Sequence, residues 1–253
     1  MWAAMLAVLA LGTQPSRSAD VRVYSSGAPA PVAKSLAATF YDTTSHRVLF
    51  TVGTVAEIQQ KLAAAEKPDV VILPSPVIEA IDKTGTLRNG SRTDLARTGI
   101  GVAVRARASL PDISTVDAVR NMLIAARSIV HSDPVGGGFA GAQIARMMTR
   151  LGVAEAVKPK VSFMFAIGGG TAAVAKGDAE IGLFNISEIL PAKGVTLVGP
   201  LPQELQSYIT FTGAVLAGSA SPEAALAFLR ALADPNAREA WTTGGFEPLG
   251  AHP

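Results

Sequence analysis

Two hydrophobic patterns alternate along most of the chain. Short apolar runs such as Val21–Tyr24 have the composition of strands, and the segments between them carry an apolar residue every three or four positions, the period of a helix. The run Asp69–Leu73 (DVVIL) is almost entirely apolar, as in a strand buried on both faces. This alternation predicts an α/β fold made of layered sheets and helices.

The predicted strands are Val21–Tyr24, Val48–Val52, Asp69–Leu73, Gly101–Arg105, Ser128–His131, Val161–Phe165, Glu180–Phe184, Val195–Val198 and Tyr208–Ala217. The predicted helices are Ala28–Tyr41, Thr54–Ala64, Pro76–Lys83, one capped by Ser114, one ending near Leu151, one opened by Gly168–Gly170, and two that start at Ser221 and Asp234.

The chain contains no Pro/Gly/Ser-rich linker, although it is long enough for two modest domains. We therefore expect two lobes joined by strands that cross between them, near Thr98–Gly101 and near Gln206–Thr212. Residues 20–99 and 207–253 would form the first lobe, and residues 100–206 the second. Crossing strands of this kind act as a hinge for closure of a cleft.

The N-terminus indicates export. Met5–Leu11 is apolar but too short to span a bilayer, and a polar stretch with small residues follows it. Residues 1–19 are predicted to be a signal peptide cleaved after Ser18 or Ala19, which places the protein in the periplasm. No basic residue precedes Arg17, so an uncleaved anchor is the alternative. No other segment of the sequence is long and apolar enough to cross a membrane.

Composition excludes several function classes. Hydrophobic residues make up 49% and charged residues 17%, which is enough for a substantial core. The 22 basic residues are balanced by 20 acidic ones without a long run of either sign, so no nucleic-acid-binding face is predicted. The absence of cysteine excludes disulfides and thiolate chemistry, and three scattered histidines argue against a zinc site. No cofactor is expected.

Candidate chemistry gathers where predicted strands run into predicted helices through small, polar or glycine-rich turns. Ligands of open α/β sheets bind beyond the carboxyl ends of strands, and helix N-termini there offer free N–H groups to an anion. The candidate ligand-binding residues are Ser25, Ser26, Gly27, Ala28, Thr54, Val55, Ser132, Gly137, Gly138, Gly168, Gly169 and Asn185.

Each turn also has a purely structural interpretation. Thr54 and Glu57 form a T-x-x-E capping box, so Thr54 is first a helix cap. The glycines of SDPVGGG are not a phosphate-binding P-loop, because no G-K-[ST] follows them. A hydrolase built on His131, Ser132 and Asp133 is a further alternative, although adjacent residues of a strand point to opposite faces and the chain has no G-x-S-x-G motif.

The chain resembles the molybdate-binding-like branch of bacterial periplasmic solute-binding proteins over the whole of its exported part. The stretches that carry the resemblance, by their order and spacing together, are VRVYSSGAPAPVAKSLAATF, VAEIQQKLAAAEKPDVVIL, SDPVGGGFAGAQIARMMTRLG, GDAEIGLFNISEIL and SPEAALAFLRALADPNAREAW. The resemblance implies the two-lobed type II binding-protein fold, a ligand held between the lobes without catalysis, and delivery to an ABC permease and its ATPase.

The resemblance does not extend to the molybdate contacts. In molybdate-binding members, hydroxyl groups occupy the positions that align with Ala28, Val55 and Asn185 of this chain. Pro29 and Pro31 also remove two N–H groups from the start of the first helix. We therefore expect a small organic anion such as a carboxylate, with molybdate or tungstate as the alternative. A periplasmic sensor subunit of the same fold is the alternative to an importer subunit, and a monomer is expected.

Overall fold

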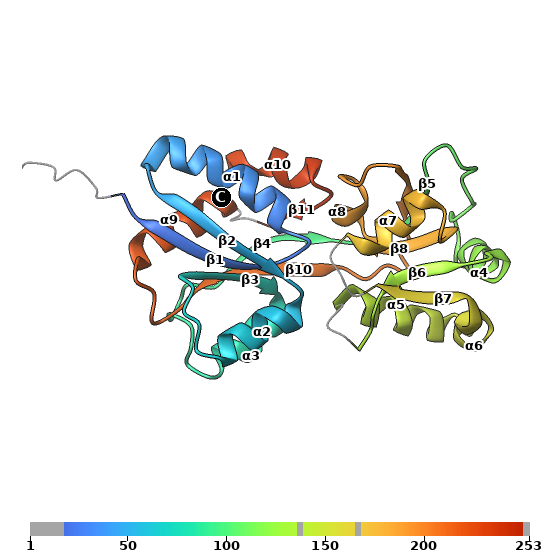
Figure 1. Ribbon diagram of the computed structural model, residues 1–253, viewed down its shortest axis with the longest axis horizontal. Coiled ribbons are helices and arrows are strands. Elements are labelled where there is room, and N and C mark those ends of the chain that lie inside the picture. The colour runs from blue at the N-terminus through green and yellow to red at the C-terminus, as the bar shows by residue number, and fades with distance from the viewer. Residues whose placement is uncertain (1–17, 136–138, 165–167, 250–253) are drawn as a thin grey trace, which may run out of the picture.

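The computed structural model describes residues 18–135, 139–164 and 168–249, so most of the predicted signal peptide lies outside the described residues. The described residues form two lobes side by side, each a sheet flanked by helices (Figure 1). The predicted α/β fold with two lobes is confirmed. The lobes are named here by their sheets: the first lobe holds the six-stranded sheet and the second lobe the five-stranded sheet.

The sheet of the first lobe has the strand order β11-β4-β10-β3-β1-β2. Strands β1, β2 and β3 run parallel, whereas β10 is antiparallel to both β3 and β4. Helices α1, α9 and α10 lie on one side of this sheet, and α2 and α3 lie on the other (Figure 1). The elements of this lobe are β1 (Asp20–Ser26), α1 (Ala30–Thr44), β2 (Arg47–Gly53), α2 (Val55–Ala63), β3 (Val70–Pro74), α3 (Ser75–Asp82), β4 (Thr93–Thr98), β10 (Ile209–Val215), α9 (Pro222–Ala233), α10 (Arg238–Thr243) and β11 (Glu247–Pro248).

The sheet of the second lobe has the order β7-β6-β8-β5-β9. Strand β6 is parallel to β7 and to β8, and β5 is antiparallel to β8 and β9. The elements of this lobe are β5 (Ile100–Arg105), α4 (Val116–Ala125), β6 (Ile129–Ser132), α5 (Phe139–Arg150), α6 (Ala154–Val157), β7 (Val161–Met164), α7 (Gly169–Lys176), β8 (Ile181–Asn185), α8 (Ile186–Ile189) and β9 (Val195–Pro200).

Most element boundaries differ from the predicted ones by a residue or two, and the short elements α6, α8 and β11 were not predicted. The first helix begins at Ala30 rather than Ala28, with Pro29 as its N-cap. The cap of α4 is Thr115 rather than Ser114, since the Thr115 hydroxyl accepts the N–H of Ala118. The strand β4 was not predicted, because its sequence TDLART has too few apolar residues to give a strand pattern.

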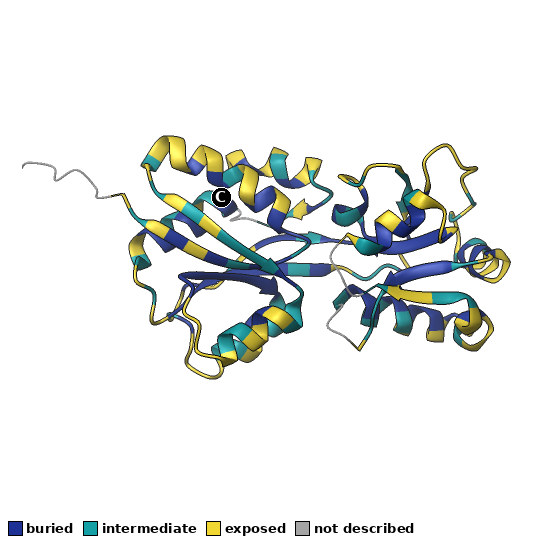
Figure 2. Ribbon diagram, viewed as in Figure 1, coloured by how far each residue is buried: buried dark blue, intermediate teal, exposed yellow. Residues whose placement is uncertain are grey.

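Burial follows the layers. The fully buried strands β3 and β8 run through the middle of their sheets, and the exposed positions lie on the outward faces of the helices, on the loops and on strands such as β2 and β7 nearer the sheet edges (Figure 2). Trp241 of α10 is buried, and its indole N–H donates to the carbonyl oxygen of Leu232 over 2.8 Å. This bond satisfies the polar group of the side chain and fixes α10 against α9.

The two crossings between lobes lie next to each other and are joined by one side chain. The first passes from β4 to β5 at Gly99, and the second passes from β9 to β10 through residues 201–208. The amide of Gln206 accepts the N–H of Ile100 over 2.7 Å and donates to the carbonyl oxygen of Ile100 over 3.0 Å. The hinge is therefore a pair of crossing segments bound by a two-way amide contact.

Replacing Gln206 by alanine is expected to lower the free energy of unfolding by about 1–3 kcal/mol, because the N–H of Ile100 loses its acceptor in a partly buried position. Urea denaturation measures the effect. Gln203, which is exposed on the same crossing segment, is the matched control, and Gln203→Ala is expected to change stability by less than about 0.5 kcal/mol. Equal losses in both variants would show that the amide contact does not stabilise the hinge.

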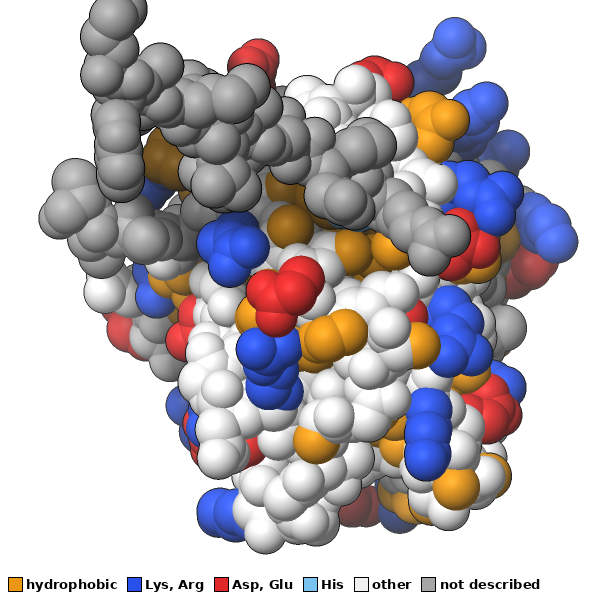
Figure 3. All heavy atoms as spheres, turned by 90° about the vertical axis from the view of Figure 1, so that its left-hand side faces the viewer, with side chains coloured by type: hydrophobic (Ala, Val, Ile, Leu, Met, Phe, Trp, Pro, Cys, Tyr) orange, Lys and Arg blue, Asp and Glu red, His pale blue; other side chains and the backbone are white. Residues whose placement is uncertain are grey.

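Charges are dispersed over the surface of the first lobe. Figure 3, which views the molecule from the side of the first lobe, shows basic and acidic side chains interspersed rather than gathered by sign. Several are paired across elements, as Arg47 is with Asp20 at 2.8 Å and Arg88 with Glu223 at 3.2 Å. No helix among the described residues combines the length and apolar character needed to cross a membrane.

Candidate functional site

A cavity lies between the lobes at the carboxyl ends of six parallel strands. In the first lobe, β1, β2 and β3 end together, and in the second lobe β6, β7 and β8 do the same. The last residue of each strand, or the residue after it, lines the cavity: Ser26, Thr54, Pro74, Ser132, Met164 and Asn185. Two sheet edges that each suit ligand binding therefore face each other across one cavity.

Helices of both lobes begin at this cavity, among them α1 and α2 of the first lobe and α5 and α7 of the second. Ala28 precedes α1, Val55 is the first residue of α2, Phe139 the first described residue of α5, and Gly168 the N-cap of α7; all four line the cavity. The first N–H groups of a helix have no partner within it and carry the positive end of its dipole. Because these ends converge from both lobes, the cavity can hold a negative group by main-chain donors alone.

The structure brings most of the predicted site residues together. Eight of them line the cavity: Ser26, Gly27, Ala28, Thr54, Val55, Ser132, Gly168 and Asn185. Ser25 and Gly169 are not among the lining residues. The Ser25 side chain is buried and its hydroxyl donates to the carbonyl oxygen of Ser26 over 2.9 Å. Gly137 and Gly138 lie outside the described residues.

Thr54 acts as a helix cap as well as a lining residue. Its hydroxyl accepts the N–H of Glu57 over 3.2 Å, and the Glu57 carboxylate accepts the N–H of Thr54 over 2.7 Å. The predicted capping box is therefore confirmed. The N–H of Thr54 is used within this box, which leaves the N–H of Val55 as the next donor at the start of α2.

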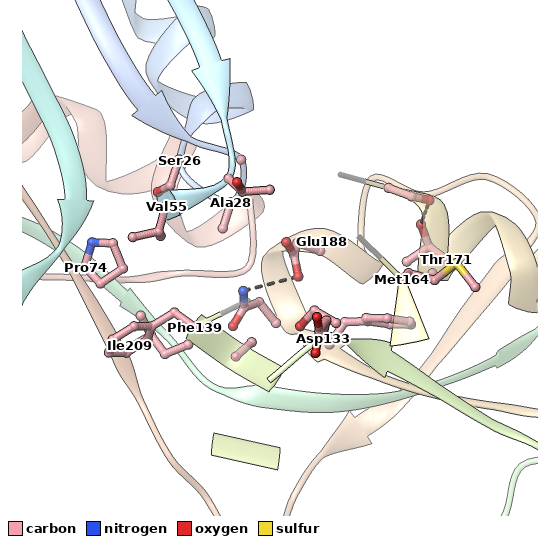
Figure 4. A pocket seen from close by; sticks show the side chains of 18 of the residues that line it. Ser26, Ala28, Val55, Pro74, Asp133, Phe139, Met164, Thr171, Glu188 and Ile209 are labelled. Atoms are coloured by element: carbon pink, nitrogen blue, oxygen red, sulfur yellow. Dashed lines mark hydrogen bonds between the residues drawn. The ribbon is translucent and has the colours of Figure 1, made fainter. Parts of the chain in front are cut away.

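The remaining lining residues of the cavity were not among the predicted ligand-binding residues. Apolar walls are supplied by Pro74, Phe139, Ala140, Met164, Phe184, Ile209 and Phe211, and further polar groups by Asp133, Thr171 and Glu188. Figure 4 shows Glu188 among the side chains that line the cavity, and its carboxyl group accepts a hydrogen bond from the side-chain amide of Asn185. The sequence gives no signal for Glu188, since a glutamate three residues after a strand is typical of an exposed helix start.

Glycine lets α5 approach the strand that ends in Ser132. A Cβ atom at Gly141 would lie 2.2 Å from the carbonyl oxygen of Ser132, and the two backbones could not remain where they are. Gly170 allows an equally close approach at the start of α7, since a Cβ there would lie 2.3 Å from the ring of Phe184. These two glycines set how near the helix starts of the second lobe come to the cavity.

Gly141→Ala is expected to lower the free energy of unfolding by about 1–3 kcal/mol through overpacking against Ser132. It would also move the start of α5 away from the cavity. Thermal unfolding with and without ligand measures both effects. Gly218→Ala is the control, because the nearest atom to its Cβ would be 3.8 Å away. If both variants unfold alike, the close approach at Gly141 is not a constraint.

The charges in the cavity are acidic rather than basic. None of the described lining residues is a lysine, arginine or histidine, whereas Asp133 and Glu188 are carboxylic acids. Burial raises the pKa of Glu188, and hydrogen bonds from the backbone and side chain of Asn185 lower it in part. The amide of Asn185 donates to Glu188 over 3.2 Å, and its Oδ1 is buried without a donor.

The structure does not bring together a hydrolase triad from His131, Ser132 and Asp133. Nδ1 of His131 lies 2.8 Å from the carbonyl oxygen of Ser132, and its ring packs edge-on to Phe163. Burial lowers the pKa of His131, which favours its neutral form. Ser132 and Asp133 line the cavity and His131 does not. Among the described residues, no cluster of three or more His, Asp or Glu side chains could hold a metal ion.

Comparison with known proteins relates the chain to binding proteins and to one enzyme. Residues 21–247 match the sequence profile of a family described as "Bacterial extracellular solute-binding protein". A protein of Pseudomonas sp. named aconitate isomerase is 32% identical over 201 residues, which cover 79% of this chain and 75% of that protein.

Solved structures share the fold at low sequence identity. The periplasmic molybdate-binding protein of Azotobacter vinelandii has a TM-score of 0.74 at 20% identity, covering 92% of this chain and 99% of that one. The sulfate-binding protein SubI of Mycobacterium tuberculosis has a TM-score of 0.75 at 17% identity, covering 91% and 87%. At these identities the similarity establishes the fold.

Proposed function

Because the chain belongs to the bacterial extracellular solute-binding protein family, we propose that it captures a small organic acid between its lobes and delivers it to an ABC permease with its ATPase. The protein would be exported to the periplasm and act as a monomer. The observation that carries the proposal is the convergence of helix starts from both lobes on one cavity. Such a cavity suits an anion, and the matched family is described as solute-binding.

An organic acid fits the lining better than a tetrahedral oxyanion does. Apolar side chains such as Phe139, Phe184 and Phe211 share the cavity with the main-chain donors, and they suit a carbon skeleton. The positions where the molybdate-binding relatives are expected to place hydroxyls are occupied by Ala28, Val55 and Asn185. The relative named aconitate isomerase, whose name refers to a tricarboxylic acid, supports the same ligand class.

Binding would couple to closure of the lobes. A ligand shifts the protein toward the closed form only if it bonds better to that form, and a ligand held by donors of both lobes does so. The crossing segments held together by Gln206 are the axis of this movement. Closure would present a surface to the permease that the open form does not.

Isothermal titration calorimetry with molybdate, sulfate, cis-aconitate, trans-aconitate and a dicarboxylate tests the proposal. Saturable binding of one or more carboxylic acids, with no heat from the two oxyanions, is the expected result. Tight binding of molybdate with no response to the acids would reject the organic acid and leave the alternative ligand.

Isomerisation of such an acid is the second candidate function, and the 32% identity to the Pseudomonas aconitate isomerase together with a carboxyl group in the cavity favours it. Incubation of cis-aconitate with the protein, followed by proton NMR, separates the two functions. A binding protein leaves the acid unchanged. Conversion to the trans isomer at a rate proportional to protein concentration would instead make the chain an enzyme.

A further inference from the structure

Glu188 places an acid group in a cavity where an anion is expected. It belongs to α8 of the second lobe and lines the same cavity as Val55 of the first lobe and Asp133 of the second (Figure 4). An ionised Glu188 would repel a carboxylate ligand, and no described lysine, arginine or histidine lines the cavity to offset it. A neutral Glu188 carries a proton that it can donate to such a ligand.

Burial of Glu188 favours the neutral acid, and the hydrogen bonds that Asn185 donates oppose this only in part. Asn185, which is 5% exposed, donates to Glu188 through its amide nitrogen, while its amide oxygen has no donor. A buried oxygen without a donor is costly unless a ligand or a proton-bearing group reaches it. A neutral Glu188 therefore has a proton to give, and Asn185 beside it has an acceptor still to be satisfied; both residues line the cavity.

The charged groups around α8 do little to stabilise an ionised Glu188. Asp133 is the other titratable side chain on the described lining. Strands β5, β8 and β9 pack against α8, and their charged residue is Arg105. Arg105 lies opposite Val195 at one end of β5, whereas Asn185 lies opposite Ile100 at the other end. Lys193 is exposed in the turn after α8. Across the cavity, Glu57 is bound to the N–H of Thr54.

We propose that Glu188 is a specificity-determining residue that meets the ligand as a neutral carboxylic acid and donates a hydrogen bond to one of the ligand's carboxylates. The inference deepens the proposed function and rests on it. A ligand would then be selected for having an acceptor at this point of the cavity. Its binding would draw one proton from solvent whenever Glu188 is ionised in the free protein.

The sign of the pH dependence follows from this linkage. Burial raises the pKa of Glu188, so the acid form prevails below that pKa, and ligand affinity is highest there. Above that pKa a proton must be taken up on binding, and the affinity is expected to fall about tenfold for each pH unit. The side chain also contributes stability to the folded state at low pH, and that contribution is lost as the pH rises through its folded pKa.

Calorimetry of wild type and Glu188→Gln with trans-aconitate, from pH 5 to pH 8, tests the proposal. The glutamine keeps a donor and removes the titration, so its affinity is expected to stay within a fewfold of the low-pH wild-type value and to lack the wild-type slope. Asp133→Asn, which neutralises the other acid of the lining, is the matched control and should keep that slope.

A stability measurement without ligand tests the neutral state of Glu188 independently of the proposed function. Glu188→Gln is expected to become more stable than wild type in urea as the pH rises from 5 to 8, because it avoids burying a charge.

If no carboxylic acid binds in the calorimetry, the proposed function fails and the hydrogen bond to the ligand fails with it. If trans-aconitate binds and Glu188→Gln retains the full wild-type pH slope, the role of Glu188 alone is overturned.

Discussion

Replacing Val55 by proline is expected to weaken binding of the organic acid by about ten- to a hundredfold while leaving the protein folded. Val55 is the first residue of α2 and lines the cavity. Proline is well tolerated at this helix position and lacks the N–H group. One hydrogen bond to a charged group is worth about 1.5–3 kcal/mol, which corresponds to that loss of affinity.

The backbone geometry at Val55 allows proline to remove one N–H donor without other changes to the helix start. Thr54 has a ψ of 162°, the extended conformation that a residue before proline prefers. The capping box between Thr54 and Glu57 uses neither the N–H nor the side chain of Val55. Calorimetry with the tightest-binding acid gives the affinity.

Two controls complete this experiment. Val55→Ala keeps the N–H and removes most of the side chain, so it is expected to retain nearly all of the affinity. Val116→Pro places proline at the first position of α4, after an extended Thr115, where no ligand is expected. If Val55→Pro binds as tightly as Val116→Pro, main-chain donors at α2 do not hold the ligand.

Asp69→Ala is expected to cause the largest loss of stability, about 3–5 kcal/mol in the free energy of unfolding. The Asp69 side chain is 1% exposed and accepts the N–H groups of Arg22, Ala220 and Ser221 and the hydroxyl of Ser219, over 2.7–3.2 Å. It therefore ties the segment before α9 to the start of β3. Its removal leaves several donors without an acceptor inside the fold.

Urea denaturation of Asp69→Ala beside Asp20→Ala measures this effect. Asp20 is an exposed acid paired with Arg47 at 2.8 Å, and exposed pairs contribute little to stability. We expect Asp20→Ala to unfold nearly as wild type does. A loss below about 1 kcal/mol for Asp69→Ala would mean that water replaces its hydrogen bonds.

The sequence predicted the layers and much of the cavity because both follow from local patterns. Apolar runs such as that of β3 identify buried strands, and the small polar residues after them lie where parallel strands end. Asn185 could be singled out because a polar amide that directly follows a buried strand needs partners. The strand β4 could not be found, since its pairing with β10 rather than its own composition makes it a strand.

Other features depend on contacts between distant parts of the chain. Gly141 could not be distinguished from other glycines, because its constraint is the carbonyl group of Ser132 on another element. Glu188 follows Asn185 closely in sequence, yet the cavity that it lines is completed by residues of the opposite lobe. Ser25 and Ser26 look equivalent in sequence, but Ser26 lines the cavity and Ser25 does not, because successive side chains of a strand point to opposite faces.

An NMR titration of the ¹⁵N-labelled protein with the acid that binds tightest tests the central claim, that one ligand is held by amides of both lobes. The account predicts that the amide signals of Gly27, Ala28 and Val55 in the first lobe and of Gly168 and Gly170 in the second shift along a common saturation curve. Shifts confined to a single lobe, or centred away from these helix starts, would contradict it.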